Sequence, residues 1–138
     1  MKKKFNKLIY FSIFILFISC NEFQKLLRNE DVKVKYEMAE KYYENEEWRR
    51  ASTLFEQIQP QYRGKPQGER ITFFYANSLL NRNNYVLAAF QFESFVKSYP
   101  ISQKVEEAAF LAAYCYYKQS PRHSLDQDET RTAIEKLQ

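Results

Sequence analysis

The stretch YEMAEKYYENEEWRRASTLFEQI, from Tyr36 to Ile58, decides the fold because its pattern returns 37 residues further along the chain. Identical residues recur at five positions: Ala39 with Ala76, Ala51 with Ala88, Phe55 with Phe92, Glu56 with Glu93 and Tyr62 with Tyr99. Similar residues recur at four more: Tyr36 with Phe73, Tyr42 with Leu79, Trp48 with Tyr85 and Ile58 with Phe95. Small and aromatic residues in a fixed order, at a period of about 20 to 50 residues, indicate a stacked repeat.

Each copy is predicted to form two helices. The order of residues in each copy resembles the small, aromatic, A-x3-F pattern of the tetratricopeptide repeat. In the first copy these residues are Ala39 and Tyr42, then Trp48, and then Ala51 and Phe55. Alanines where two helices cross let the backbones approach, and large rings fill the space beside them. We therefore predict an all-α fold, a tetratricopeptide-like superhelix of antiparallel helix pairs.

The repeat boundaries follow from the polar and proline-containing segments. Residues 45–47 (NEE) and 82–84 (RNN) are predicted turns within the repeats, and QPQYRGKPQG, residues 59–68, is predicted to connect the first repeat to the second. Pro100 closes the second repeat, whereas Arg63 stands at that place in the first. The predicted repeats cover about 32–66 and 69–102.

A third repeat begins in register and then loses it. Phe110, Ala113 and Tyr116 stand 37 residues after their counterparts, but the next A-x3-hydrophobic pair, Ala133 and Leu137, comes eight residues late. An insertion over about 120–128 is therefore predicted inside a repeat of about 106–138. The chain ends within this repeat without a closing helix, and stacks need a capped end, so we expect a longer protein.

The first 19 residues have the layout of a secretory signal peptide. Lys2, Lys3, Lys4 and Lys7 precede an apolar run from Leu8 to Ile18. A run of this length is short for a membrane-spanning helix, which needs about 20 apolar residues. A tilted or extended anchor helix is the alternative interpretation.

A cysteine directly follows a small residue at the end of the apolar run. Ser19 and Cys20 resemble the lipobox of bacterial lipoproteins, with Phe17 in place of the preferred leucine. The resemblance implies that Cys20 is the first mature residue and carries lipid. Apart from this covalent lipid, we expect no cofactor. Several acyl chains anchor a protein stably. Residues 20–30 would then form a lipidated linker, either a short helix or a tether, whose apolar residues dock on the first repeat: Phe23, Leu26 and Leu27.

Charge and histidine content argue against nucleic-acid binding and catalysis. Four lysines and no acidic residue lie in residues 1–19, so the rest of the chain has 17 basic and 17 acidic side chains and no excess positive charge for a nucleic acid. The only histidine, His123, lies in the predicted inserted loop, so we expect neither a histidine-based metal site nor a Ser-His-Asp triad from these residues. We predict a non-enzymatic protein without a metal.

A binding groove is predicted along the first helix of each repeat, the helix that lines the concave surface of such stacks. Residues spaced i, i+4 and i+7 lie along one stripe of a helix. Across the first helices of the three repeats, most residues at this spacing are aromatic. The predicted groove residues are Tyr36, Tyr43, Phe73, Asn77, Leu80, Phe110, Tyr114 and Tyr117. Rings give a large contact area with few rotors to freeze, so this groove suits another polypeptide. The alternative is that these rings only pack the core.

Two further segments resemble the BamD family of outer-membrane assembly lipoproteins. Residues 90–100 read FQFESFVKSYP, and residues 116–127, inside the third repeat, read YYKQSPRHSLDQ. The second segment is the more specific, because a generic repeat carries no such insertion. Together with the signal peptide and Cys20, the resemblance covers essentially all 138 residues but only about half of the family's usual length.

The resemblance implies a non-catalytic role in outer-membrane protein assembly. The expected partners are a BamA-like barrel protein, other assembly lipoproteins and unfolded outer-membrane proteins, on the periplasmic side of the outer membrane. The inserted loop is a second expected contact, through Arg122 and Asp126; Arg122 either pairs with a partner carboxylate or pins the loop against Asp126 or Asp128.

Two other functional classes remain open from the sequence. A SusD-type lipid-anchored nutrient-binding protein also contains tetratricopeptide units, but with long glycan-binding excursions between them. A periplasmic tetratricopeptide scaffold for cell-wall enzymes would lack the SPR insertion at residues 120–122.

Overall fold

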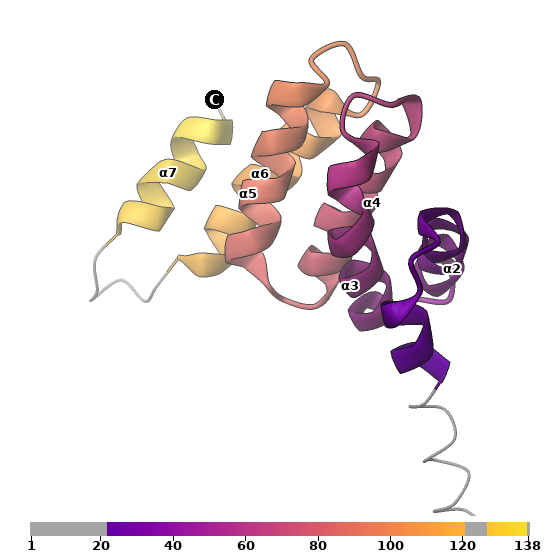
Figure 1. The fold of residues 1–138 in the computed structure, drawn as a ribbon. Coiled ribbons are helices and arrows are strands. Elements are labelled where there is room, and N and C mark those ends of the chain that lie inside the picture. Colours follow the sequence, from indigo (N-terminus) through magenta and orange to yellow (C-terminus); the bar gives the residue numbers. More distant parts are fainter. Residues whose placement is uncertain (1–21, 121–126, 138) are drawn as a thin grey trace, which may run out of the picture.

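The computed structural model describes residues 22–120 and 127–137. The predicted signal peptide over residues 1–19, the lipidation site Cys20 and the loop residues Arg122 and Asp126 lie outside the described residues. The elements in chain order are α2 (Val32–Glu44), α3 (Trp48–Ile58), the short 3-10 helix η1 (Gln59–Tyr62), α4 (Pro66–Asn81), α5 (Tyr85–Ser98), α6 (Val105–Gln119) and α7 (Asp128–Leu137). The predicted all-α repeat fold is confirmed: helices pair into successive hairpins, with no strand among the described residues (Figure 1).

The turns within the first two hairpins lie where the polar segments predict them. Each turn contains one residue with a left-handed backbone, Glu46 at φ 59° and Asn83 at φ 60°. These two residues are 37 positions apart, so the repeat extends to the backbone conformation of the turn. Asparagine adopts positive φ more readily than glutamate, and the second turn is therefore the less strained of the two.

Side chains and prolines define where three helices begin. The Asp31 carboxylate caps α2 by accepting hydrogen bonds from the backbone N–H groups of Lys33 at 2.8 Å and Val34 at 3.3 Å. Asn84 caps α5 in the same way. Pro66 is the first residue of α4, where a missing N–H costs nothing.

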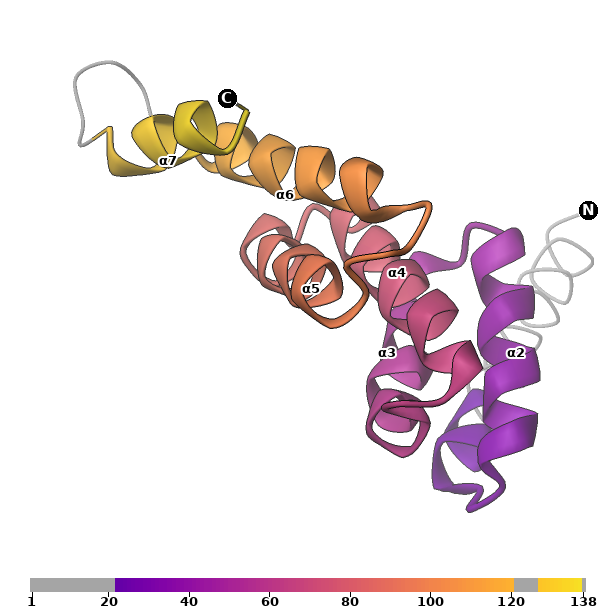
Figure 2. The ribbon, with the colours of Figure 1, turned by 90° about the horizontal axis from the view of Figure 1, so that it is seen from above.

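Alanines mark the places where helices cross. Five of them, at repeat-equivalent positions, have no exposed surface: Ala39, Ala51, Ala76, Ala88 and Ala113. Figure 2 shows the result, with α2, α4 and α6 following one another along one side of the stack and α3 and α5 behind them. We call the surface formed by α2, α4 and α6 the first-helix face.

The segment after the predicted lipidation site docks on the first hairpin. Residues 22–28 are helical, and Phe23, Leu26 and Leu27 pack against the core, so the predicted docking is observed. The Phe23 ring meets the edge of the Tyr42 ring with 5.7 Å between centroids. A lipid attached before residue 22 would therefore be connected to the first hairpin through this packed helix.

The third hairpin keeps its predicted core alanine but is joined differently. Ala113 in α6 and Ala133 in α7 are both buried. Glu93 of α5 links the two helices, because its carboxylate accepts a hydrogen bond from the Tyr116 hydroxyl at 3.1 Å and pairs with the Lys136 ammonium at 2.7 Å. The helix α7 thus packs onto α6 despite the long connection between them.

None of the described helices combines the length and apolar character needed to cross a bilayer.

Candidate functional site

The eight predicted groove residues lie on the first helices α2, α4 and α6 but differ in their exposure. Phe73 is buried, with 3% of its surface exposed, whereas Phe110 and Tyr117 are 58% and 62% exposed. The remaining five are half-buried: Tyr36, Tyr43, Asn77, Leu80 and Tyr114. The predicted stripe is therefore buried to different extents in α2, α4 and α6.

Tyr43 of α2 belongs to an aromatic cluster that joins the first and second hairpins. Its ring stacks on Phe74 of α4, with centroids 4.2 Å apart and planes 6° from parallel, and also meets the edges of Trp48 and Phe55. Burial raises the pKa of the Tyr43 hydroxyl, and the nearby carboxylate of Glu107 on α6 raises it further. The first and third hairpins therefore approach each other across α4 at this place.

A charged chain of contacts runs beside this cluster. The Tyr36 hydroxyl donates a hydrogen bond to Glu40 at 2.6 Å, and Glu40 pairs with the Arg70 guanidinium at 2.9 Å. The Arg70 guanidinium also lies 4.9 Å from the centroid of the Phe74 ring, within the range of a cation–π contact. Burial, followed by the bond to Glu40, raises the pKa of Tyr36 to about 12, so its hydroxyl stays a donor at neutral pH.

Phe73 forms part of the core of the second hairpin. Its ring contacts Phe92 and Phe95 of α5, with centroid separations of 5.9 and 5.5 Å. One side of the ring still faces Lys104, whose ammonium lies 4.4 Å from the centroid. Phe73 therefore acts mainly in packing, and its contribution to a binding surface is limited to that side.

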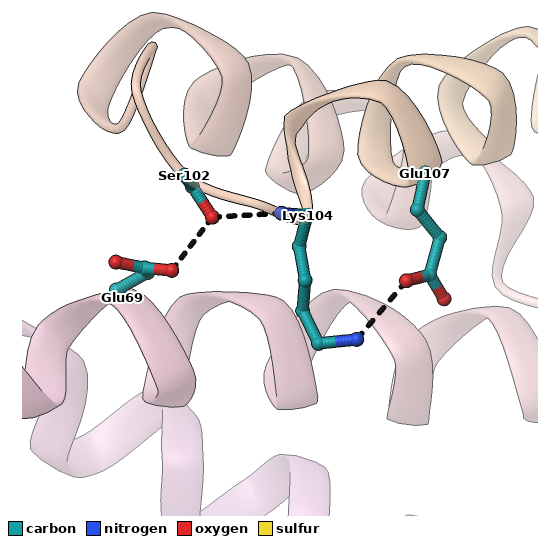
Figure 3. A network of polar contacts seen from close by, with 4 residues as sticks. All are labelled: Glu69, Ser102, Lys104 and Glu107. Atoms are coloured by element: carbon teal, nitrogen blue, oxygen red, sulfur yellow. Dashed lines mark hydrogen bonds and ion pairs between the residues drawn. The ribbon is translucent and has the colours of Figure 1, made fainter.

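Polar contacts hold Lys104 in place where α6 begins. Figure 3 shows Ser102 donating a hydrogen bond to Glu69 of α4 at 2.6 Å and accepting one from the backbone N–H of Lys104 at 3.0 Å. The Lys104 ammonium pairs with Glu107 at 3.0 Å. The start of α6 is thus tied to α4, with a cation directed over the aromatic surface.

A cleft of about 340 Å³ opens on the first-helix face between α4 and the start of α6. Its walls combine two rings with two cations and one acid: Pro66, Glu69, Arg70, Phe73, Phe74 and Lys104. Arg70 lies over the Phe74 ring and Lys104 over the Phe73 ring, so a group entering the cleft would meet both cations beside the aromatic surface. This cleft, with Tyr43 beside it, is the candidate functional site.

The exposed aromatics of α6 continue the same face. Phe110 and Tyr117 stand two turns apart on the helix, and Tyr114 between them has its ring centroid 6.3 Å from that of Tyr117. The Lys118 ammonium lies 5.6 Å from the Tyr114 centroid. These side chains form an accessible aromatic patch beyond the cleft.

Of the six residues that line the cleft, only Phe73 was among the predicted groove residues; the other five are Pro66, Glu69, Arg70, Phe74 and Lys104. Phe74 stacks on Tyr43 across the hairpin boundary, although the 37-residue register aligns Tyr43 with Leu80. A repeat pattern reports equivalent positions and not contacts between hairpins. The spacing of Arg70 and Phe74, one helical turn apart, was the available signal.

The described residues include many carboxylates and one buried free cysteine, Cys115. No cluster of histidine, cysteine, aspartate or glutamate within them could hold a metal ion. Burial raises the pKa of the Cys115 thiol to about 11, so this cysteine is protonated at neutral pH and is a poor nucleophile.

Comparison with protein families gives a match over most of the chain. The family model YfiO, described as an outer membrane lipoprotein, matches residues 28–138. A search of curated proteins found no match. The matched region covers all of the helical hairpins and most of the chain, and it agrees with the resemblance at the level of an outer membrane lipoprotein family. The chain therefore belongs to the YfiO family of outer membrane lipoproteins.

Proposed function

We propose that this protein is a non-catalytic subunit of the β-barrel assembly machinery, which binds unfolded outer-membrane proteins and partner subunits for insertion into the outer membrane. The observation that carries the proposal is the aromatic cleft on the first-helix face of an outer membrane lipoprotein family member. An unfolded membrane barrel exposes many aromatic and aliphatic side chains, and the cleft and the α6 patch bury such groups.

The chemistry of the cleft fits a polypeptide that is not yet folded. Arg70 and Lys104 can pair with carboxylates or backbone carbonyls of the client, while Phe73 and Phe74 provide apolar contact. Rings stabilise a bound segment at low entropic cost because they have few rotatable bonds. Contacts of this type are tolerant of sequence, as a protein with many clients requires.

The proposed attachment is a lipid on Cys20, facing the periplasm. Since Phe23, Leu26 and Leu27 pack against the core, a lipid on Cys20 would hold the first hairpin close to the membrane surface. Replacing Cys20 with serine should move the protein from the membrane fraction to the soluble periplasmic fraction. Retention in the membrane would show that the apolar segment 8–18 is itself the anchor.

The proposed role is tested by purifying the lipidated protein from membranes and identifying its companions by mass spectrometry. We expect a BamA-like barrel protein to copurify. A TonB-type transporter would instead favour a SusD-type nutrient-binding protein, and cell-wall enzymes would favour a periplasmic scaffold. The Cys20→Ser variant, purified from the soluble fraction, is the control for companions that bind the membrane only.

A further inference from the structure

A second cleft lies between α5 and the segment that follows η1. Its volume is about 590 Å³, and it shares no residue with the cleft beside Phe74. The lining comes from η1 and the following loop, from α4 and from α5: Gln59, Arg63, Gly64, Thr72, Phe90, Gln91, Ser94, Ser98 and Tyr99. Most of these residues carry a hydrogen-bonding side chain, in contrast to the aromatic first cleft.

Hydrogen bonds at the base of the cleft fix the orientation of Gln91. The Gln59 amide donates to Gln91 Oε1 at 3.1 Å and to Thr72 Oγ1 at 3.3 Å. The Thr72 hydroxyl in turn donates to the Gly68 carbonyl at 2.8 Å. Because Gln91 Oε1 accepts from Gln59, the Gln91 amide nitrogen points away from this network.

The Nε2 group of Gln91 is a hydrogen-bond donor without a partner among the described residues, although Gln91 itself is largely buried. Gln91 is only 9% exposed, and its Nε2 donates no hydrogen bond to any described residue. No fully buried side-chain nitrogen or oxygen of the described residues lacks a partner. The Gln91 Nε2 group is therefore not fully buried, and because Gln91 lines the cleft we assign its two N–H donors to that space.

The other free groups of the cleft are also donors. Arg63 forms no ion pair and no hydrogen bond with a described residue, and neither do the hydroxyls of Ser94 and Ser98. The Arg63 guanidinium is the only formal charge in the lining, since no carboxylate is among the lining residues. A donor-rich cleft with one guanidinium is complementary to a carboxylate, which accepts two parallel bonds from arginine.

The shape of the cleft favours a carboxylate that is part of a polypeptide. Phe90, Ser94 and Ser98 follow one another along α5, over a helix length of roughly 12 Å at 1.5 Å per residue. This length accommodates about four residues of extended chain at roughly 3.3 Å each. Phe90, 61% exposed, adds an apolar contact at one end. A small free carboxylate would leave most of this surface unused.

We propose that the cleft binds a carboxylate carried by an extended segment of another polypeptide. Arg63 pairs with the carboxylate, Gln91 Nε2 donates a further hydrogen bond, and Phe90 contacts a neighbouring apolar side chain of the segment. The site is distinct from the first-helix face, so it does not depend on the function proposed for that face.

Peptides that differ in a single group test this site on the full chain in nonionic detergent micelles. The first peptide is acetyl-Gly-Phe-Gly-Asp-Gly-amide, and the second has asparagine in place of aspartate. We expect the aspartate peptide to bind at least about tenfold more tightly, which is the typical effect of a hydrogen bond to a charged group. It should also shift the side-chain amide signals of Gln91 in a ¹⁵N NMR spectrum. Equal affinities for the two peptides would overturn the proposal.

Variants separate the cleft from general charge attraction. Arg63→Gln should remove the preference for aspartate, and Gln91→Met should reduce it while thermal unfolding remains that of a folded protein. The matched control is Arg49→Gln, an exposed arginine on α3 outside the cleft, which should leave the preference intact. An equal loss in Arg49→Gln would contradict the assignment.

Two further ligands identify the source of the carboxylate. The asparagine peptide with a free C-terminal carboxylate asks whether a chain end serves as well as a side chain; Arg63-dependent binding of this peptide would support the carboxylate site and assign it to chain ends. Sodium acetate asks whether the polypeptide is needed. Displacement of the aspartate peptide by acetate at equal concentration would overturn the polypeptide part of the proposal.

Discussion

The same repeat position is core in α4 and surface in α6. Phe73 and Phe110 are 37 residues apart and chemically identical, yet 3% of the first side chain is exposed and 58% of the second. Leu80 and Tyr117 differ in the same direction, since Leu80 is half-buried and Tyr117 is exposed. One sequence pattern is therefore buried in α4 and exposed in α6.

The difference comes from the second helix of each hairpin. In the second hairpin α5 brings Phe92 and Phe95 against Phe73. In the third hairpin the connection delays α7 by eight residues, so Leu137 takes the place of Phe92 and is 55% exposed. In the second hairpin the partner helix thus covers Phe73 with two rings, whereas in the third hairpin the residue at the Phe92 position is itself mostly exposed.

The largest expected effect is on stability at the buried member of this pair. Phe73→Ala should lower the free energy of unfolding by about 3 to 5 kcal/mol, because it removes a buried ring and leaves a cavity. Phe110→Ala should change it by less than about 1 kcal/mol, since the ring is mostly exposed. Urea unfolding followed by circular dichroism measures both. Equal losses would show that Phe110 is covered in solution.

A second comparison concerns Gly68 and its counterpart Val105, each near the start of a first helix. A Cβ at Gly68 would lie 2.3 Å from the Tyr62 carbonyl oxygen and 2.9 Å from the Tyr99 hydroxyl. Gly68→Ala should therefore cost about 2 to 3 kcal/mol of folding free energy, as expected for overpacking against backbone.

Val105 has room for its side chain at the equivalent position and is half-buried. Val105→Ala should cost about 1 kcal/mol or less. If Gly68→Ala were neutral in the same unfolding experiment, the close approach of η1 to α4 would be wrong.

A smaller effect on stability is expected at alkaline pH. It concerns Tyr75 of α4, whose counterpart 37 residues later in α6 is Ala112. Burial raises the pKa of Tyr75 to about 12, with the charge of Glu56 adding to the shift. A phenol whose folded pKa lies above its unfolded value of about 10 stabilises the fold below that pH. This stabilisation is lost as the pH rises from about 10 to 12.

The free energy of unfolding should consequently fall by about 1 kcal/mol per such tyrosine between about pH 9 and pH 11. Tyr75→Phe should reduce the fall, and Tyr36→Phe should do so as well, because the pKa of Tyr36 is also raised to about 12. A pH dependence unchanged in both variants would contradict the raised pKa values.

Much of the fold could be predicted because repeated residues report repeated packing. The alanines at the helix crossings and the turns around Glu46 and Asn83 follow directly from the 37-residue period. The eight-residue delay of Ala133 also predicted a longer connection before α7. The 37-residue period, however, identifies equivalent positions in successive hairpins. It gives no information about the distance between residues of different hairpins.

The candidate site was predictable only in part for this reason. Helical spacing predicted a stripe that contains Tyr43 and Tyr117, and these residues lie on α2 and α6, the former half-buried and the latter exposed. The stack of Tyr43 on Phe74 and the placement of Lys104 over Phe73 arise from the angle between hairpins, which side-chain packing sets. The polar cleft around Gln91 was missed because no sequence pattern joins Gln59, Thr72 and Gln91.

Photo-crosslinking tests most directly whether the first-helix face holds other polypeptides. A photoreactive phenylalanine analogue at Asn77 or Tyr117 should crosslink to a urea-unfolded outer-membrane barrel protein, and the same analogue at Arg49 or Glu56, both exposed on α3 and outside both clefts, should give several-fold less product. Crosslinks that are equal at all four positions, or stronger from Arg49 and Glu56, would contradict the account.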